Sequence, residues 1–489
     1  MKILESPQLF ILFIAISLSS LCCPTQAQAV SLNLRPQDVP ALVLKQGLDT
    51  QSEILRQEQS RLSLVEIEKI YDYQLTGDLG TQTSKFQSVT GSNSASNDQL
   101  TTANLKLAKS FLTGTTLALE YNKSSDRADL NPGSLGLGSY EQNIVGISLE
   151  QNLWRNFFGV ANRSDLRSIE TGLKASKLSE INNLQEVVLT AIRAYWAAYV
   201  AQESFQESVR SRDRYHKVVA SVKKKTGYGY NSPGDAAQAE AELESREIIV
   251  KTLSVNYLTA MDQLRLTLNL PAETEVKFVV PEKIQAPPEK MNEVNIESLR
   301  PIQASLLKLE SANESLKASQ SYAHPDISLV GRYATQGFDL TSSNDSFNQA
   351  LAGSRPRYYL GLKLQYYFGS DYQKELQLNR RINQQLADLD LQKKRLQLAD
   401  AKNNLLRQIQ ADYAILLSTE TQKGFREKAS QELSRSYSQG RTDIAILIES
   451  LNKYFNAQVD KIRAVGNYQT ALSEWLAFQD QLVIENIKQ

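Results

Sequence analysis

The sequence predicts an elongated α+β protein built from two internal structural repeats. Three observations lead to this prediction. Several short stretches alternate strictly between apolar and polar residues, as strands with one apolar and one wet face do. Two much longer stretches, about 160–225 and 372–437, read as helix, and each is followed by a glycine-containing turn and a returning helix. The dipeptide Phe-Gly that precedes each long helix occurs at 158–159 and 368–369, about 210 residues apart.

The first 29 residues have the layout of a secretory signal peptide. An apolar run at 9–21 follows a basic residue, and small residues lead to the expected cleavage site after residue 29. Cys22 and Cys23 precede that site, so we expect a mature chain without disulfides. Lipidation of one of these cysteines is the alternative.

Composition argues against several classes of function. The 54 basic and 54 acidic residues cancel, so bulk charge points to neither nucleic acid nor an acidic substrate. With two histidines and no cysteine expected in the mature chain, little material is left for a metal or nucleophile site. We therefore expect no metal, no cofactor and no enzymatic activity. No later apolar run approaches the ~20 residues of a spanning helix, so membrane entry would require a β-barrel.

Period-two alternation marks the expected strands. In the stretch 145–153, Val145, Ile147 and Leu149 share one face, while Ser148 and Glu150 share the other. Similar alternation occurs at 75–80, 327–333 and 359–368, and in an expected hairpin at 104–121. Alternation alone leaves open an ordinary antiparallel sheet that covers a core.

The helical stretches have a different period. Leading helices are expected at 38–70 and 300–322, and each long helix of about 66 residues would extend roughly 100 Å. No compact domain holds two such helices, so the molecule should be elongated. Heptad ladders in the returning helices predict supercoiling against neighbours. They comprise Leu243, Val250, Leu253, Tyr257, Ala260 and Leu264, and then Ile448, Leu451, Phe455, Ile462, Val465, Leu472 and Leu476.

These elements divide the mature chain into a first repeat at 30–269, an irregular proline-rich linker at 270–298 and a second repeat at 299–489. The strand region of the first repeat is about 42 residues longer than that of the second. The surplus matches the hairpin near 102–122 with its flanking loops.

Two turn motifs and one helix-to-strand segment carry a family resemblance. The motifs are "GYNSPGD" and "GRTDIAILIES" at the turns, and the segment is "ESLRPIQASLLKLESANESLKASQSYAHPDISL". In this order, and with the doubled architecture, the mature chain resembles the TolC-like outer-membrane efflux proteins over essentially its whole length. The resemblance implies a homotrimer whose protomers each give four strands to a shared twelve-stranded barrel in the outer membrane. The helices would continue that barrel as a hollow periplasmic coiled-coil cylinder.

The surplus hairpin departs from the family's four strands. It could be an enlarged outer loop, which is the interpretation we favour, or it could add strands to the barrel.

The two turns have clear local chemistry. Ser232 is placed to cap a helix that starts with proline, and Asp235 completes a capping box. Gly229 would end the incoming helix. In the second copy, Gly440 and Asp443 take the corresponding roles. Well-made helical hairpins would explain these residues without any further function.

In the TolC-like family these turns close and narrow the periplasmic end of the duct. By position, Asp235 and Tyr437 match a pair that bonds at the tip, which makes them gating contacts. The family's paired acids fall here on Ile446 and Glu449, so we expect one acidic ring and an apolar collar at the pore constriction, with weaker cation selectivity. Asp443 could compensate if it points inward. A solvated glutamate on the outer face is the competing interpretation of Glu449.

Other side chains give weaker signals. The basic run Lys223–Lys225 could dock an acidic adaptor, although such a run is usually a solvated face. His216 and His324 have no companions at metal-ligand spacing and are interpreted as structural. The aromatic residues at 195–199 are interpreted as packing between helices.

The sequence is compatible with two alternative functions. The first is an outer-membrane exit duct of a tripartite efflux or type I secretion system, working with a periplasmic adaptor and an inner-membrane pump. The second is a soluble periplasmic coiled-coil adaptor or structural protein. Aromatic residues at the ends of the alternating runs, such as Trp154 and Tyr366, favour the membrane.

Overall fold

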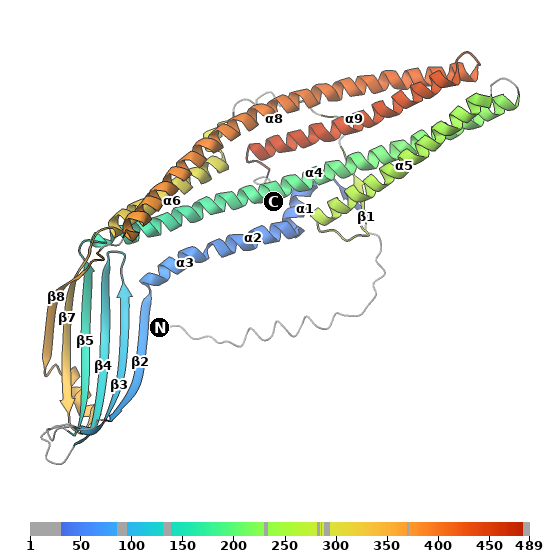
Figure 1. Ribbon diagram of the computed structural model, residues 1–489. Helices are drawn as coiled ribbons and strands as arrows, with labels where there is room; N and C mark the ends of the chain where they lie inside the picture. Colours follow the sequence, from blue (N-terminus) through green and yellow to red (C-terminus); the bar gives the residue numbers. More distant parts are fainter. Residues whose placement is uncertain are drawn as a thin grey trace, which may run out of the picture. The chain divides into compact units, whose positions relative to one another are not determined.

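The computed structural model describes most of the chain, and the expected signal peptide, Gly229 and Ser232 lie outside the described residues. The order of its elements is shown in Figure 1. The described residues are 31–85, 95–130, 138–228, 233–280, 284, 286–287, 294–368 and 371–482. The chain divides into two compact units, the first comprising 1–50, 186–289 and 405–489, and the second 51–185 and 290–404.

The first unit is built on four helical segments. The C-terminal parts of α4 (Val160–Gly227) and α8 (Tyr372–Ser438) belong to it. Each is followed by a returning helix, α5 (Pro233–Thr267) and α9 (Ile444–Phe478) respectively. The two long helices have 68 and 67 residues, and the two returning helices have 35 each. These matched lengths agree with the expected duplication, which itself stays a prediction.

Helix α9 is buried on more than the face that its heptad ladder marks. Of the ladder residues, Ile448, Leu451, Phe455 and Val465 are buried, whereas Leu476 is 41% exposed. A second buried set consists of Ala464, Tyr468, Ala471 and Trp475. The Tyr468 ring lies 5.3 Å from that of Tyr413 on α8. Gly466 of α9 lies very close to Val200 of α4: a Cβ added to Gly466 would lie 2.5 Å from a methyl carbon of Val200. The helix therefore packs against two neighbours, and the ladder describes only one.

A small parallel sheet was not expected from the sequence. Strand β1 (Ser31–Leu34) pairs with β6 (Glu275–Phe278). The expected linker at 270–298 is therefore not irregular throughout. The strand forms because Val276 and Leu34 are both buried and the two backbones satisfy each other's hydrogen bonds.

The aromatic side chains at 195–199 hold this small sheet against α4. Tyr195 is fully buried, and its hydroxyl donates to the Leu34 carbonyl at 3.2 Å. Its ring packs edge-on against Phe278 at 5.1 Å. We expected these aromatic residues to pack between helices, but Tyr195 packs against both strands of the small sheet, because β1 and β6 lie beside this part of α4. Helix α1 (Asp38–Gln46) also buries Val39 and Val43.

The leading helices are present with one modification. The stretch expected as a single helix at 38–70 forms α1, then α2 (Leu48–Ser60), α3 (Leu62–Glu68) and a 3-10 turn. The helix expected at 300–322 is α6 (Arg300–Tyr322). Within the part of the chain that the structure describes, none of the helices has the length and apolar character needed to cross a membrane.

The second unit contains one six-stranded antiparallel sheet, whose strands lie side by side in the order β2-β3-β4-β5-β7-β8 (Figure 1). Every stretch that alternates in the sequence contributes to a strand, although the last three residues of the stretch at 359–368 lie beyond the end of β8. A short helix, α7 (Ser343–Leu351), separates the last two in the chain. The strands are β2 (Tyr73–Lys85), β3 (Ala95–Ser110), β4 (Thr115–Leu130), β5 (Ser139–Asn152), β7 (Asp326–Asp339) and β8 (Pro356–Gln365).

The surplus hairpin lies inside this sheet. Leu107 on β3 pairs with Leu75 on β2 and with Leu119 on β4, and Leu119 pairs in turn with Ile147 on β5. The interpretation that we favoured, an enlarged outer loop, is therefore wrong. The hairpin joins the sheet because its apolar and polar residues alternate in step with those of β2 and β5. Its backbone groups can therefore pair with both neighbouring strands while its large apolar side chains stay on the apolar face.

One face of the sheet is apolar and exposed. A row across all six strands has relative exposures between 40% and 78%. It consists of Leu75, Leu107, Leu119, Ile147, Tyr333 and Tyr358. Leu79, Leu105, Leu149, Leu360 and Leu362 add further exposed apolar side chains. A contiguous apolar surface of this kind marks contact with lipid or with another protein.

The opposite face is polar. The carboxylate of Glu120 on β4 lies 3.4 Å from the Lys106 ammonium on β3 and 3.6 Å from the Arg332 guanidinium on β7. It also accepts a hydrogen bond of 3.1 Å from the Ser148 hydroxyl on β5. This network connects four strands, including both strands of the surplus hairpin.

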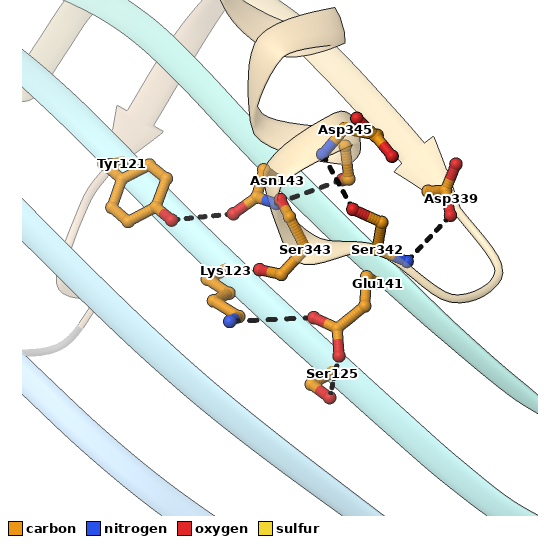
Figure 2. Close-up of polar contacts among 10 residues, drawn as sticks. Tyr121, Lys123, Ser125, Glu141, Asn143, Asp339, Ser342, Ser343 and Asp345 are labelled. Atoms are coloured by element: carbon orange, nitrogen blue, oxygen red, sulfur yellow. Dashed lines mark hydrogen bonds and ion pairs between the residues drawn. The ribbon is translucent and has the colours of Figure 1, made fainter.

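Helix α7 covers one end of the apolar face, where the side chains become polar (Figure 2). The Tyr121 hydroxyl donates to the Asn143 amide oxygen at 2.7 Å, and the Asn143 amide nitrogen donates to the Ser343 carbonyl at 3.2 Å. Nearby, Lys123 lies 3.7 Å from Glu141. Asn143 is fully buried, and its hydrogen bond to Ser343 fixes the helix to the sheet.

A short connection that contains a 3-10 helix (Phe157–Gly159) joins β5 to α4. The Asn156 side chain accepts a hydrogen bond of 3.0 Å from the Ala161 backbone N–H in the first turn of α4. Gly159 has φ +77°, and a Cβ there would lie 1.6 Å from the Leu112 carbonyl oxygen. Only glycine fits this position, which explains the first of the two Phe-Gly dipeptides.

Candidate functional site: the tips of the helical hairpins

The end of α8 is a complete Schellman motif. Gly440 has φ +74°, and its N–H donates to the Tyr437 carbonyl at 3.0 Å. The Arg441 N–H donates to the Ser436 carbonyl at 2.9 Å. These are the two hydrogen bonds that define the motif, and they require the left-handed conformation that glycine adopts readily. The predicted role of Gly440 is confirmed.

Among the described residues, both returning helices begin at the predicted positions. Helix α5 begins at Pro233, with Asp235 in its first turn. Asp443 is the N-cap of α9, and its carboxylate accepts a hydrogen bond of 2.8 Å from the Ala445 N–H. The expected contributions of Gly229 and Ser232 fall outside the described residues.

The two predicted gating residues lie close together in the folded chain. Asp235 on α5 and Tyr437 on α8 line the same surface depression. Asp235 is half-buried, and only 5% of Tyr437 is exposed. The direct bond between them that the family resemblance implies stays a prediction.

Lys225 connects the ends of α4 and α8. Its ammonium group donates to the Tyr437 carbonyl and lies 4.1 Å from the centre of the Tyr437 ring. The same carbonyl also accepts the N–H of Gly440. A hydrogen bond from a charged donor and a cation–π contact therefore act on one residue. This contact links the two hairpin tips of the chain.

Beneath the tips, the hairpins share an apolar core drawn from α4, α5, α8 and α9. Tyr215 is its largest fully buried member, and burial raises the pKa of its phenol. The Tyr215 hydroxyl donates to the Ile448 carbonyl at 3.1 Å and to the Asn452 side chain at 2.5 Å. The other members are Val219, Val222, Ala239, Tyr437, Ile444, Leu447, Ile448 and Leu451. The tip is thus a packed structure on which the turns are held.

The predicted constriction residues lie on the exposed side of α9. Ile446 is 50% exposed, although its neighbours Leu447 and Ile448 are buried. The Glu449 carboxylate is also exposed. Asp443 is exposed as well, with its carboxylate used as the helix cap. One face of the helix therefore carries these three side chains away from the core of the chain.

Glu449 has a partner that the sequence interpretation missed. The Lys453 ammonium lies 2.5 Å from its carboxylate. The hydrogen bond from Lys453 and its positive charge hold the pKa of Glu449 below its ordinary value. The carboxylate stays ionised, but a cation accompanies it. The i,i+4 spacing of the two residues was a visible signal of this pair.

The lysine run does not act as a unit. Lys223 forms an ion pair of 2.5 Å with Glu240 on α5, and Lys225 binds Tyr437. Lys224 lies at the surface and lines the same depression. At least two of the three side chains therefore serve contacts inside the tip.

The two histidines have local structural contacts. His324 stacks on Trp154 with ring centres 5.8 Å apart, and His216 lies 3.6 Å from Glu247. Over the described ranges, no cluster of His, Cys, Asp and Glu side chains is arranged to hold a metal ion.

Comparison with known proteins identifies the fold. No protein-family model and no curated protein sequence matches the chain. Solved structures do match over nearly the whole chain. The Campylobacter jejuni CmeC outer membrane channel has a TM-score of 0.67 at 14% identity, with 93% of this chain and 88% of that chain covered.

Two further structures agree. The outer membrane protein VceC from Vibrio cholerae has a TM-score of 0.66 at 12% identity, with 92% of this chain and 96% of that one covered. The Neisseria gonorrhoeae MtrE outer membrane channel, solved in its open state, has a TM-score of 0.65 at 15% identity, with 94% of each chain covered. The chain therefore has the fold of these outer-membrane channels, as the resemblance to TolC-like proteins implied.

Proposed function

We propose that this chain, which has the fold of outer-membrane channels, is the passive exit duct of a tripartite efflux or type I secretion system. Small molecules or polypeptide would pass from a periplasmic adaptor and an inner-membrane pump to the exterior. The pump would supply the energy, and the duct itself would carry out no reaction.

The observation that carries this proposal is the sheet with one exposed apolar face and one polar face. Side chains such as Leu119 and Leu360 are 53% and 77% exposed. A soluble protein would leave this surface in water at a cost of about 25 cal/mol for each Å². In an outer membrane the same face would contact lipid, while the face of Glu120 would line water. Under the alternative of a soluble adaptor or structural rod, a partner protein would have to cover the whole apolar face.

A homotrimer is the assembly that the TolC-like resemblance implies. An exposed apolar ladder on α8 supports association with further copies. It comprises Leu378, Ile382, Leu389 and Leu396, which are between 43% and 70% exposed. Their steps of 4, 7 and 7 residues have the period of a coiled-coil seam. A helix of a neighbouring copy would cover them.

In such a trimer, the tips would form the periplasmic constriction. Ile446 would make an apolar collar and Glu449 a single acidic ring, with Asp443 at its rim. Because Lys453 accompanies Glu449, the ring would be close to neutral overall. We therefore propose a constriction with weak cation selectivity.

Fractionation of cells that make the protein tests the proposal. We expect the mature chain in the outer-membrane fraction, released only by detergent, as a trimer that resists dissociation by heat. A soluble monomer in the periplasm would contradict the proposal and support the adaptor alternative. Co-purification of the trimer with an adaptor then tests the partner assignment.

A further inference from the structure

We infer that the transmembrane wall has eighteen strands, six from each of three copies, closed where β2 of one copy pairs with β8 of the next. The inference rests on the proposed trimer. It differs from the twelve-stranded wall that the family resemblance implies.

The surplus hairpin has the properties of wall strands. On β3 and β4, Leu105, Leu107 and Leu119 lie on the exposed apolar face, in register with β2 and β5. On the other face, Lys106 and Glu120 take part in the network that reaches Arg332 on β7. If the hairpin were folded away from the wall, β3 and β4 would lose their pairing with β2 and β5. Their apolar side chains would also no longer lie on the same face as those of the other strands. All six strands therefore belong to one continuous wall segment.

The wall segment ends in two open edges. Within the described residues, β2 is paired only with β3, and β8 only with β7. The side chains of both strands are almost all exposed, unlike those of the interior strands. Native proteins protect the edges of sheets, and hydrocarbon contains no water to satisfy unpaired N–H and C=O groups. Each edge therefore needs a partner strand.

A second copy of this chain supplies the partner with the correct direction. All neighbouring strands in the sheet are antiparallel, so β2 and β8, at the two ends of a six-stranded order, run in opposite directions. Placing β2 beside β8 of a neighbour continues the antiparallel pattern without a break. One chain cannot close on itself, because about eight strands are already needed to leave room for interior side chains.

The additional strands widen the passage. With strands about 4.8 Å apart and tilted by about 40°, a twelve-stranded wall has a backbone diameter of roughly 24 Å. Eighteen strands give roughly 36 Å, which more than doubles the cross-section. The membrane segment would then not limit the size of the cargo, and selection by size would fall to the helical tips.

Single-particle imaging of the full-length mature trimer in lipid nanodiscs tests the inference directly. We expect eighteen wall strands, with β2 and β8 of adjacent copies hydrogen-bonded. A trimer with twelve wall strands and the hairpin outside the wall would overturn the inference and leave the proposed function standing. A chain that does not insert in lipid would overturn both.

Cysteine labelling provides a second test, since the mature chain is expected to have no native cysteine. Leu105→Cys, Leu107→Cys and Leu119→Cys should be protected from a water-soluble maleimide in nanodiscs. Their neighbours Asn104→Cys, Lys106→Cys and Asn122→Cys should react at least tenfold faster, because they face the lumen. Equal labelling at all six positions would place the hairpin in water and overturn the inference.

Discussion

Replacing Lys225 with methionine should loosen the tip. The substitution keeps most of the side-chain volume and removes the ammonium group that binds the Tyr437 carbonyl and lies 4.1 Å from its ring centre. A hydrogen bond from a charged donor contributes about 1.5–3 kcal/mol, and a cation–π contact about 0.5–2 kcal/mol. One ammonium group makes both contacts, so they do not add fully. A loss of about 2 kcal/mol corresponds to a roughly 30-fold shift toward separated helix ends.

Single-channel recording of the purified protein in planar bilayers measures this effect. If the contact holds the tip closed, Lys225→Met should raise the open probability or the mean conductance severalfold. Lys224→Met is the matched control, because it removes the same charge one residue away, from a side chain at the surface. The change in charge at the tip is then equal in the two variants.

Similar currents from the two variants would refute the reasoning, since the effect would then come from charge and not from the contact. Wild-type currents from Lys225→Met would refute it as well. Adding Lys223→Met to Lys225→Met should change the currents little further. Both side chains of the Lys223–Glu240 ion pair are exposed, and exposed ion pairs contribute little to stability.

Further predictions follow from other contacts. In a KCl gradient at low salt, Lys453→Gln should shift the reversal potential toward cation selectivity, and Glu449→Gln should shift it toward anion selectivity. If Glu449→Gln leaves both the conductance and the block by divalent cations unchanged, Glu449 does not line the constriction. Gly159→Ala should abolish the mature membrane form, because its Cβ would overlap a backbone carbonyl of the β3–β4 turn, whereas Gly331→Ala on β7 has free space and should assemble normally, as judged by trimer yield. Burial raises the pKa of Glu203, so the folded state binds this proton more tightly than the unfolded state does, and the protein loses stability as pH rises above the ordinary carboxyl pKa. Glu203→Gln should therefore raise the melting temperature relative to wild type at neutral pH and change it little below about pH 4.

Strands and long helices could be predicted because each leaves a period in the sequence. The alternation at 145–153 and the helical character of 372–437 both appear as elements in the structure. The place of the hairpin could not be predicted in the same way. Alternation tells which face a side chain takes, and the neighbours of a strand depend on pairing between distant segments. The small sheet of β1 and β6 was missed for a related reason, since four-residue strands are too short to show a period.

At the tip, too, local features could be predicted from the sequence and contacts between distant residues could not. Gly440 and Asp443 could be placed because their chemistry is local, within one turn of a helix. The contact between Lys225 and Tyr437 joins residues on different hairpins, so no local pattern marks it. Lys453 is different, because its i,i+4 spacing from Glu449 is a local pattern from which the ion pair can be predicted.

The most direct test of the central claim is the ionic current of the purified, lipid-inserted protein. The proposed function predicts discrete current steps in planar bilayers from wild type, and larger or more frequent steps from Lys225→Met. Flotation with liposomes would first establish that the protein has inserted. Inserted protein that gives no conductance, in wild type and in Lys225→Met alike, would contradict the account of this chain as an outer-membrane duct.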